Sequence, residues 1–183
     1  MVLNGYTNYP RIHVNEELTF SLDNSTVTFG TLSVGNSFTS VTSVTSTVST
    51  NAGFGYTIRA WSTQQMSAQV NLPQFTINDW AGTNAVPTAW TLKCIADSNS
   101  CGFGYSSDDG ALTTGTPDRF TNGGPNYAGF THGDQNSNGD PVADETGTAQ
   151  NSKHQINLKV SVPSGQPAGV YKTTLLFIAT QTF

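Results

Sequence analysis

Apolar and polar residues alternate along several stretches of this chain, a pattern typical of strands that are buried on one face. Leu18, Phe20 and Leu22 alternate with threonine and serine. The same period of two recurs further along the chain, in residues 27–29, 56–60, 90–94 and 156–162. We expect a strand in each of these stretches. No segment carries a helical pattern with caps.

Two longer stretches are less regular. In SFTSVTSVTSTVST, residues 37–50, the apolar residues Phe38, Val41, Val44 and Val48 have nearly helical spacing. Serine, threonine and valine are weak helix formers, so we expect a long, mostly exposed strand instead. The final stretch, YKTTLLFIATQTF, is apolar on both faces from Leu175 to Ile178. This predicts a strand in the middle of a sheet or one covered by a partner.

The composition supports an all-β fold with many turns. The 183 residues include 18 glycines and 8 prolines, and the polar residues are mostly threonine and serine. Residues 16–80 and 153–183 carry the strand patterns of a sandwich, whereas residues 96–152 are dense in Gly, Asp, Asn and Thr. We therefore expect one β-sandwich domain over 16–183, with long decorated loops in an insertion at 96–152, after an N-terminal extension of residues 1–15.

The charge pattern narrows the classes of partner. The net charge is −5, only 10% of residues are charged, and lysine and arginine form no cluster. Nucleic acid and anionic membrane surfaces are therefore not expected as partners. No stretch is apolar for long enough to span a membrane. Low charge and abundant threonine indicate an extracellular protein, so we expect that a leader peptide was removed before residue 1 or is not included.

Cys94 and Cys101 are the two cysteines. Their spacing suits a short loop closed at a hairpin, and in an oxidising compartment they would form a disulfide. The alternative is a pair of reduced, buried thiols. A zinc site is not expected, because no histidine lies nearby in sequence.

The stretch DQNSNGDPVADE, residues 134–145, is the densest run of oxygen-bearing side chains. It matches the calcium-loop template D-x-[DN]-x-[DN]-G-x5-E, with Gly139 at the turn. The candidate ligands are Asp134, Asn136, Asn138, Asp140 and Glu145. No helix is expected on either side, and few carboxylates remain among the ligands, so a plain solvated loop is the competing interpretation. A calcium ion here would be structural. Asp108 and Asp109 form a second acidic cluster, which is a weaker candidate for metal ligands. The alternative is that they belong to a turn.

The sequence offers little for catalysis. His13, His132 and His154 lie in no recognisable metal or nucleophile motif, and no G-x-S-x-G turn occurs. We expect a protein that is not an enzyme, with no catalytic residues. Binding of carbohydrate is a separate possibility, because tryptophans exposed on a sandwich face would form a platform for sugars. Trp80, at the end of a strand after Asn78 and Asp79, is the tryptophan that we expect to be exposed.

Both ends of the chain resemble a known group of proteins. ELTFSLDNSTVTFGTLSVG and TSTVSTNAGFGYTIRAW near the start, and LKVSVPSGQPAGVYKTTLLFIATQTF at the end, are similar to secreted β-sandwich proteins of bacterial and archaeal surfaces. These include camelysin/TasA-like fibre subunits, archaeal bundling-pilus subunits and WxL-type wall proteins, although the W-x-L tripeptide is absent here. The middle of the chain is similar to uncharacterised secreted proteins of candidate-phylum bacteria.

This resemblance implies an antiparallel, jelly-roll-like β-sandwich that polymerises at the cell surface. It implies assembly by donor-strand complementation, in which an extended N-terminal segment completes the sheet of the next subunit. The apolar residues available for this role are Leu3, Tyr6, Tyr9, Ile12 and Val14. We therefore expect a structural subunit of an extracellular filament, pilus or surface layer that self-associates into a homopolymer. The alternative is a monomeric extracellular module for adhesion, or for binding carbohydrate such as cell-surface glycans.

Overall fold

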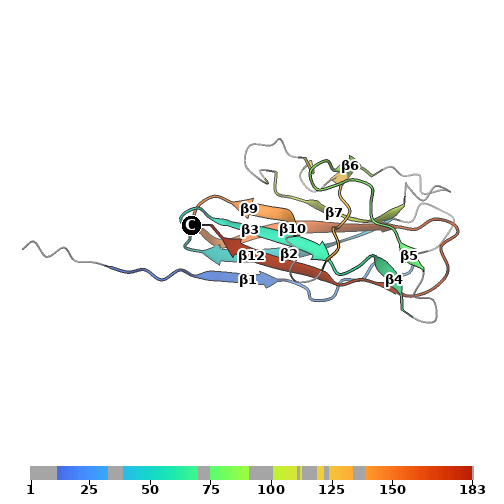
Figure 1. The fold of residues 1–183 in the computed structure, drawn as a ribbon, viewed down its shortest axis with the longest axis horizontal. Helices are drawn as coiled ribbons and strands as arrows, with labels where there is room; N and C mark the ends of the chain where they lie inside the picture. The colour runs from blue at the N-terminus through green and yellow to red at the C-terminus, as the bar shows by residue number, and fades with distance from the viewer. Residues whose placement is uncertain are drawn as a thin grey trace, which may run out of the picture.

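The protein folds into antiparallel sheets. The computed structural model describes residues 12–32, 39–69, 75–90, 101–110, 112, 119–121, 124–133 and 139–182. This part of the chain contains twelve strands and no helix (Figure 1). The all-β prediction is therefore confirmed, while the jelly-roll connectivity stays a prediction.

Two larger sheets form the body of the molecule. The first has the order β1-β2-β10-β7 and contains β1 (Leu18–Leu22), β2 (Thr39–Thr50), β10 (Ala149–Ser161) and β7 (Gly102–Ser107). The second has the order β12-β3-β9 and contains β12 (Leu175–Gln181), β3 (Tyr56–Ser62) and β9 (Asp140–Glu145). Every pair of neighbours in both sheets is antiparallel.

Two small sheets complete the fold. One has the order β11-β4-β5 and consists of β11 (Tyr171–Lys172), β4 (Met66–Ala68) and β5 (Thr76–Ile77). The other pairs β6 (Thr88–Ala89) with β8 (Asn126–Tyr127). In Figure 1 the β11-β4-β5 sheet lies at the end of the molecule opposite to the C-terminus.

The two larger sheets share one apolar core. Val48, Leu158 and Phe103 of the first sheet belong to the same buried cluster as Ile58 and Val142 of the second. Inward residues alternate with outward ones along β3 and β10, as the period of two predicted. The arrangement is therefore sandwich-like, with the core between two sheets.

Gly55 allows the chain to pass from the first sheet to the second. It follows β2, precedes β3 and has a φ of +84°, which favours glycine. A Cβ at this position would lie 1.7 Å from the carbonyl oxygen of Glu145. A side chain therefore cannot be accommodated here without moving the start of β3 or the end of β9.

The strand at 39–50 is confirmed, but its mostly exposed character is wrong. β2 lies between β1 and β10, and Val44, Ser46, Val48 and Thr50 are buried on its inner face. Ser46 donates a hydrogen bond to the carbonyl of His154, and Thr50 donates one to that of Glu17. Because two buried positions are polar, the period of two was hidden and the valines alone suggested a helical spacing.

Two further predictions of position were wrong. Residues 27–29 form no strand, although Val27 and Phe29 pack partly against the core and the Phe29 ring meets that of Phe103 edge-on at 5.9 Å. In the described part of the chain β12 lies at the edge of its sheet, so a position in the middle of the sheet is wrong, while the alternative of a strand covered by a partner stays a prediction. Its outward residues stay half-buried or exposed, and Ile178 is 47% exposed.

The region 96–152, predicted to be rich in loops, also supplies strands. β7 completes the first sheet, β9 completes the second, and β10 begins within this region. The region is therefore part of the sandwich itself in its described segments. Among the described residues, no helix is long and apolar enough to cross a membrane.

Candidate functional site

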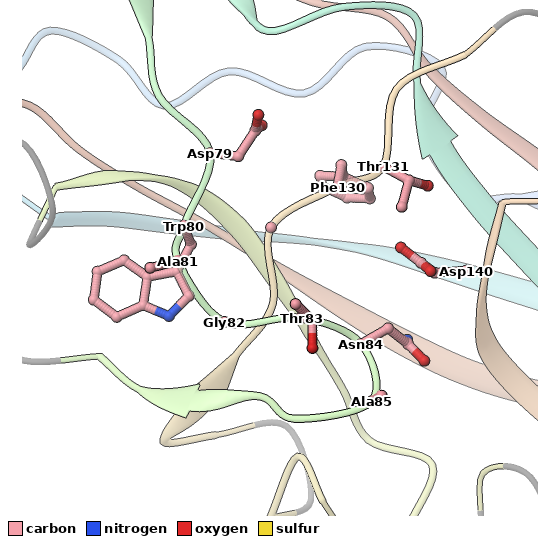
Figure 2. Close-up of a pocket in the computed structure, with 11 residues that line it drawn as sticks. Asp79, Trp80, Ala81, Gly82, Thr83, Asn84, Ala85, Phe130, Thr131 and Asp140 are labelled. Carbon is pink, nitrogen blue, oxygen red and sulfur yellow. The ribbon is translucent and has the colours of Figure 1, made fainter.

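A pocket of about 390 Å³ opens beside the edge of β7 (Figure 2). The chain from Asp79 to Ala85 forms one wall, residues 129–131 form a second, and Asp140 at the start of β9 forms a third. Ala81, Thr83 and Ala85 are exposed, whereas Gly82 and Asn84 between them are buried. This alternation turns every second side chain of the 81–85 segment outward.

The two main walls are held together through their backbones. The N–H of Gly129 donates to the carbonyl of Gly82 at 2.8 Å, and Ala128 and Tyr105 exchange two backbone hydrogen bonds. A Cβ on Gly129 would lie 2.4 Å from the carbonyl oxygen of Trp80, so this close approach requires glycine.

Asn84 anchors the pocket wall to both larger sheets. Its Nδ2 donates to the hydroxyl of Tyr105 and to the carbonyl of Pro141, each at 2.8 Å. Its Oδ1 accepts a hydrogen bond of 2.7 Å from Nη2 of Arg119. A buried amide with these three bonds holds one orientation, so the wall is formed in the absence of any ligand.

The carboxylate of Asp140 lines this pocket and has a shifted pKa. Burial raises the pKa of Asp140, and hydrogen bonds from Thr131 together with the charges of Arg59 and Arg119 act in the opposite direction. The guanidinium of Arg59 also donates to the carbonyl of Gly139 at 3.0 Å. The pocket therefore combines a half-buried carboxylate with nearby positive charge.

A hydrogen-bonded chain of Ser62, His132 and Asp79 lies next to the pocket. Nδ1 of His132 is 2.7 Å from the Ser62 hydroxyl, and Nε2 is 2.6 Å from Oδ2 of Asp79. A neutral ring satisfies both contacts when Nε2–H donates to Asp79 and the Ser62 hydroxyl donates to Nδ1. No sequence signal predicts this arrangement, because the three residues are far apart in sequence and lie in no motif.

The three residue types are those of a serine hydrolase, but the environment is not suited to that reaction. Ser62 is only 1% exposed, and its N–H and C=O are both used in backbone bonds to residues 131 and 133. A substrate carbonyl therefore cannot approach the hydroxyl. The geometry instead ties the end of β3 to two separate loops. Oδ1 of Asp79 is buried and makes no hydrogen bond with any described residue.

A second polar cluster lies around His154 in the core. The hydroxyl of Tyr56 is 2.6 Å from Nε2 of His154, which is also 3.8 Å from Glu145, while Nδ1 is 4.0 Å from Asp109. Burial raises the pKa of Tyr56 to about 12, and the neighbouring carboxylates add to this effect. Glu145 and Asp109 lie beside different ring nitrogens of His154. The imidazole, Glu145 and Asp109 therefore cannot all ligate the same metal ion.

The described ligands of the predicted calcium loop do not converge. Asp140 and Glu145 stand at opposite ends of β9, about 16 Å apart at the rise of an extended strand. Calcium ligands lie about 2.3–2.6 Å from the ion, so these two residues cannot share one site. Asp134, Asn136 and Asn138 lie outside the described residues. No group of three or more metal-ligating side chains occurs in the described part of the chain.

The other acidic pair, Asp108 and Asp109, follows β7 directly. Burial raises the pKa of Asp108, and its Oδ1 has no hydrogen-bond partner among the described residues. Asp109 accepts a hydrogen bond from the N–H of Asp144 in β9. The Asp109 carboxylate therefore links the end of β7 in the first sheet to β9 in the second.

Trp80 does not form an exposed platform, and this prediction is corrected. Its side chain is 6% exposed and stacks on Trp90, with ring centroids 4.0 Å apart. Its Nε1 donates to the hydroxyl of Thr88 at 2.9 Å. The ammonium of Lys159 lies 5.0 Å from the Trp90 ring and 4.9 Å from that of Tyr127. The residues 78–90 cover β7, and that cover buries the tryptophans.

The remaining predicted residues are only partly within the described chain. Cys101 is buried at the start of β7, but Cys94 lies outside the described residues, so their disulfide stays a prediction. Leu3, Tyr6 and Tyr9 also lie outside them. Ile12 and Val14 are described, and they are 89% and 72% exposed.

No family model matches this chain, and no curated protein matches it. The class of protein that the fold defines is therefore an all-β, sandwich-like domain.

Proposed function

We propose that this chain is a structural subunit of an extracellular filament, pilus or surface layer, and that it assembles by adding a strand of one copy to a sheet of the next. The observation that carries the proposal is an asymmetry of the sandwich. One side is sealed by its own chain, whereas the other side presents two edge strands with half-buried apolar residues.

The sealed side runs along β7 and β9. Backbone bonds from residues 78–80 and 128 occupy the outer edge of β7. At the edge of β9, Asn84 donates to the carbonyl of Pro141, Ser107 donates to that of Val142, and Asp109 accepts the N–H of Asp144. These contacts leave little of either edge for another chain.

The other side is formed by β1 and β12. Among the described residues, β1 pairs only with β2, and β12 pairs only with β3. Gln181 at the end of β12 donates to Glu17 and Thr50, so the two edges lie close together at this end. Core-facing side chains on both strands remain only partly buried, namely Leu18, Phe20, Leu22, Leu175, Phe177 and Ala179.

A donor segment is available in the same chain. Residues 12–17 are exposed and form no strand. Asn51 is hydrogen-bonded to the backbone of Asn15 and Glu17, so residues 12–14 are the part that leads away from the body of the sandwich (Figure 1). Ile12 and Val14 are two residues apart, so in an extended segment they point to the same face. Burial of each contributes roughly 1.5–3 kcal/mol, in addition to the backbone hydrogen bonds of strand addition.

The partner is a second copy, because the segment points away from its own sandwich. A free edge flanked by partly exposed core residues is a template for pairing with another chain. Addition of a strand there would cover the half-buried side chains of β1 and β12. This role requires no catalytic site, and the burial of Ser62 supports a non-enzymatic function.

Electron microscopy and light scattering of the full chain test this proposal. Regular filaments or sheets are expected from the full chain, and only monomers, lighter than the 19.4 kDa of the full chain, are expected after removal of residues 1–15. The double variant Ile12→Asp, Val14→Asp should also remain monomeric. Its matched control is Asn15→Asp, which adds charge in the same segment without removing an apolar anchor.

The same proposal includes a Cys94–Cys101 disulfide and a structural calcium ion in the 134–145 stretch. Mass spectrometry after alkylation under denaturing conditions tests the first, and calorimetric titration of calcium tests the second. A disulfide-linked chain would resist alkylation until it is reduced. Weak calcium affinity, in the range of about 0.1–1 mM, is expected for a loop with few carboxylates.

A further inference from the structure

We propose that the pocket between residues 79–85 and Asp140 binds a neutral saccharide unit, such as the terminal pyranose of a glycan. This site lies on the sealed side of the sandwich, away from the β1 and β12 edges. Binding of a saccharide at this pocket therefore does not depend on the assembly proposed above.

The size and lining of the pocket suit a single sugar ring. Its volume of about 390 Å³ falls at the lower end of the range of about 300–1,000 Å³ for small-molecule sites. Pyranoses have hydroxyl groups around their edge and an apolar face of C–H groups. The pocket provides both kinds of surface, with the methyl group of Ala85 and a small exposed part of the otherwise buried Phe130 side chain among carboxylate and hydroxyl groups (Figure 2).

The charges around the pocket favour a neutral ligand. An anion would approach the carboxylates of Asp79 and Asp140 in a chain whose net charge is −5. An ammonium group would meet the positive charges of Arg59 and Arg119, which already act on Asp140. Hydroxyl groups avoid both repulsions, because they can donate to the carboxylate of Asp140 and accept from the hydroxyl of Thr83.

The walls are fixed before a ligand enters. Asn84 is held by Tyr105, Pro141 and Arg119, and the backbones of Gly82 and Gly129 are bonded to each other. Binding therefore requires little ordering of the protein, which lowers its entropic cost. The alternation along 81–85 presents Thr83 and Ala85 outward from this rigid wall.

Saturation-transfer NMR on the full chain tests the proposal, with methyl glycosides of the common neutral hexoses and N-acetylhexosamines as probes. Glucosamine and glucuronic acid serve as the cationic and anionic probes. A neutral glycoside is expected to bind with a Kd on the order of 1 mM, as is usual for one ring in an open site. Neither charged probe should bind more tightly than the neutral one.

Two matched variants locate the site. Ala85→Trp fills the pocket with an outward-facing ring and should weaken binding at least about tenfold. Val86→Trp adds the same ring one residue further on, at a position that is 68% exposed and outside the pocket lining, and should bind as the wild type does. Thr83→Val removes one hydroxyl at nearly constant shape and should weaken binding severalfold.

Three results would overturn the proposal. They are the absence of binding by every neutral probe up to about 50 mM, unchanged binding by Ala85→Trp, and binding of a charged probe alone. Circular dichroism of each variant shows whether it is folded. Glycoside binding is measured on the subunit itself. A negative result would therefore overturn the saccharide site without bearing on the proposal of filament formation.

Discussion

Asn84 gives the sharpest test of how the pocket wall is attached to the two sheets, through the variant Asn84→Ala. The amide is buried and links Tyr105, Pro141 and Arg119 by three hydrogen bonds. A net contribution of about 0.5–1.5 kcal/mol is usual for each of the two neutral bonds, and about 1.5–3 kcal/mol for the bond to a charged group. The loss should total about 2.5–6 kcal/mol in the free energy of unfolding.

Urea titration and thermal unfolding, both followed by circular dichroism, measure this loss. For a chain of this length, about 2–4 °C of melting temperature corresponds to 1 kcal/mol, so the thermal midpoint should fall by about 5–24 °C. Asn78→Ala is the control, because Asn78 is exposed on the same segment and should change stability by less than about 0.5 kcal/mol. A loss below about 1 kcal/mol for Asn84→Ala would refute the reasoning.

Three further substitutions test other parts of the structure. Gly55→Ala should destabilise the fold by at least several kcal/mol, because its Cβ would overlap the carbonyl of Glu145. Urea titration measures this loss, and a urea midpoint equal to that of the wild type would contradict the close approach. Burial raises the pKa of Asp108, so its ionised form is disfavoured in the folded state, and this cost grows as the pH rises through the folded pKa. Asp108→Asn should therefore raise the melting temperature at pH 7, and the gain should shrink as the pH falls toward the ordinary pKa of aspartate; a gain that does not depend on pH would count against a titration effect. Lys159→Met should cost about 1 kcal/mol and alter tryptophan fluorescence, since the ammonium lies 5.0 Å from the Trp90 ring; unchanged emission and stability would mean that the ring contact contributes nothing.

The strand periodicity predicted much of the fold, because one face of each main strand is apolar. This worked for β1, β3 and β10, whose inward residues are mostly leucine, isoleucine, phenylalanine, tyrosine and valine. It was less informative for β2, where Ser46 and Thr50 are buried through hydrogen bonds to backbone carbonyls. Polar residues satisfied in this way are indistinguishable from surface residues in a sequence.

The candidate site could be predicted only in fragments. Asp140 and Trp80 were singled out, but the pocket depends on Asn84 and Gly129, which bear no local signal. Ser62, His132 and Asp79 come together only because a bridge at the end of β3 places residues 131–133 beside it. The burial of Trp80 likewise depends on the cover that residues 78–90 form over β7. Such contacts between distant segments are set by the tertiary fold.

The central claim is that the β1 and β12 edges accept the N-terminal segment of another copy. Hydrogen exchange measured by mass spectrometry tests it most directly, on a chain that begins at residue 16 and is mixed with a synthetic peptide of residues 1–17. The account predicts that the peptide slows amide exchange in β1 or β12 and leaves β7 and β9 unchanged. A peptide carrying Ile12→Asp and Val14→Asp should have no effect. Unchanged exchange in both edge strands at saturating wild-type peptide would contradict assembly by strand addition.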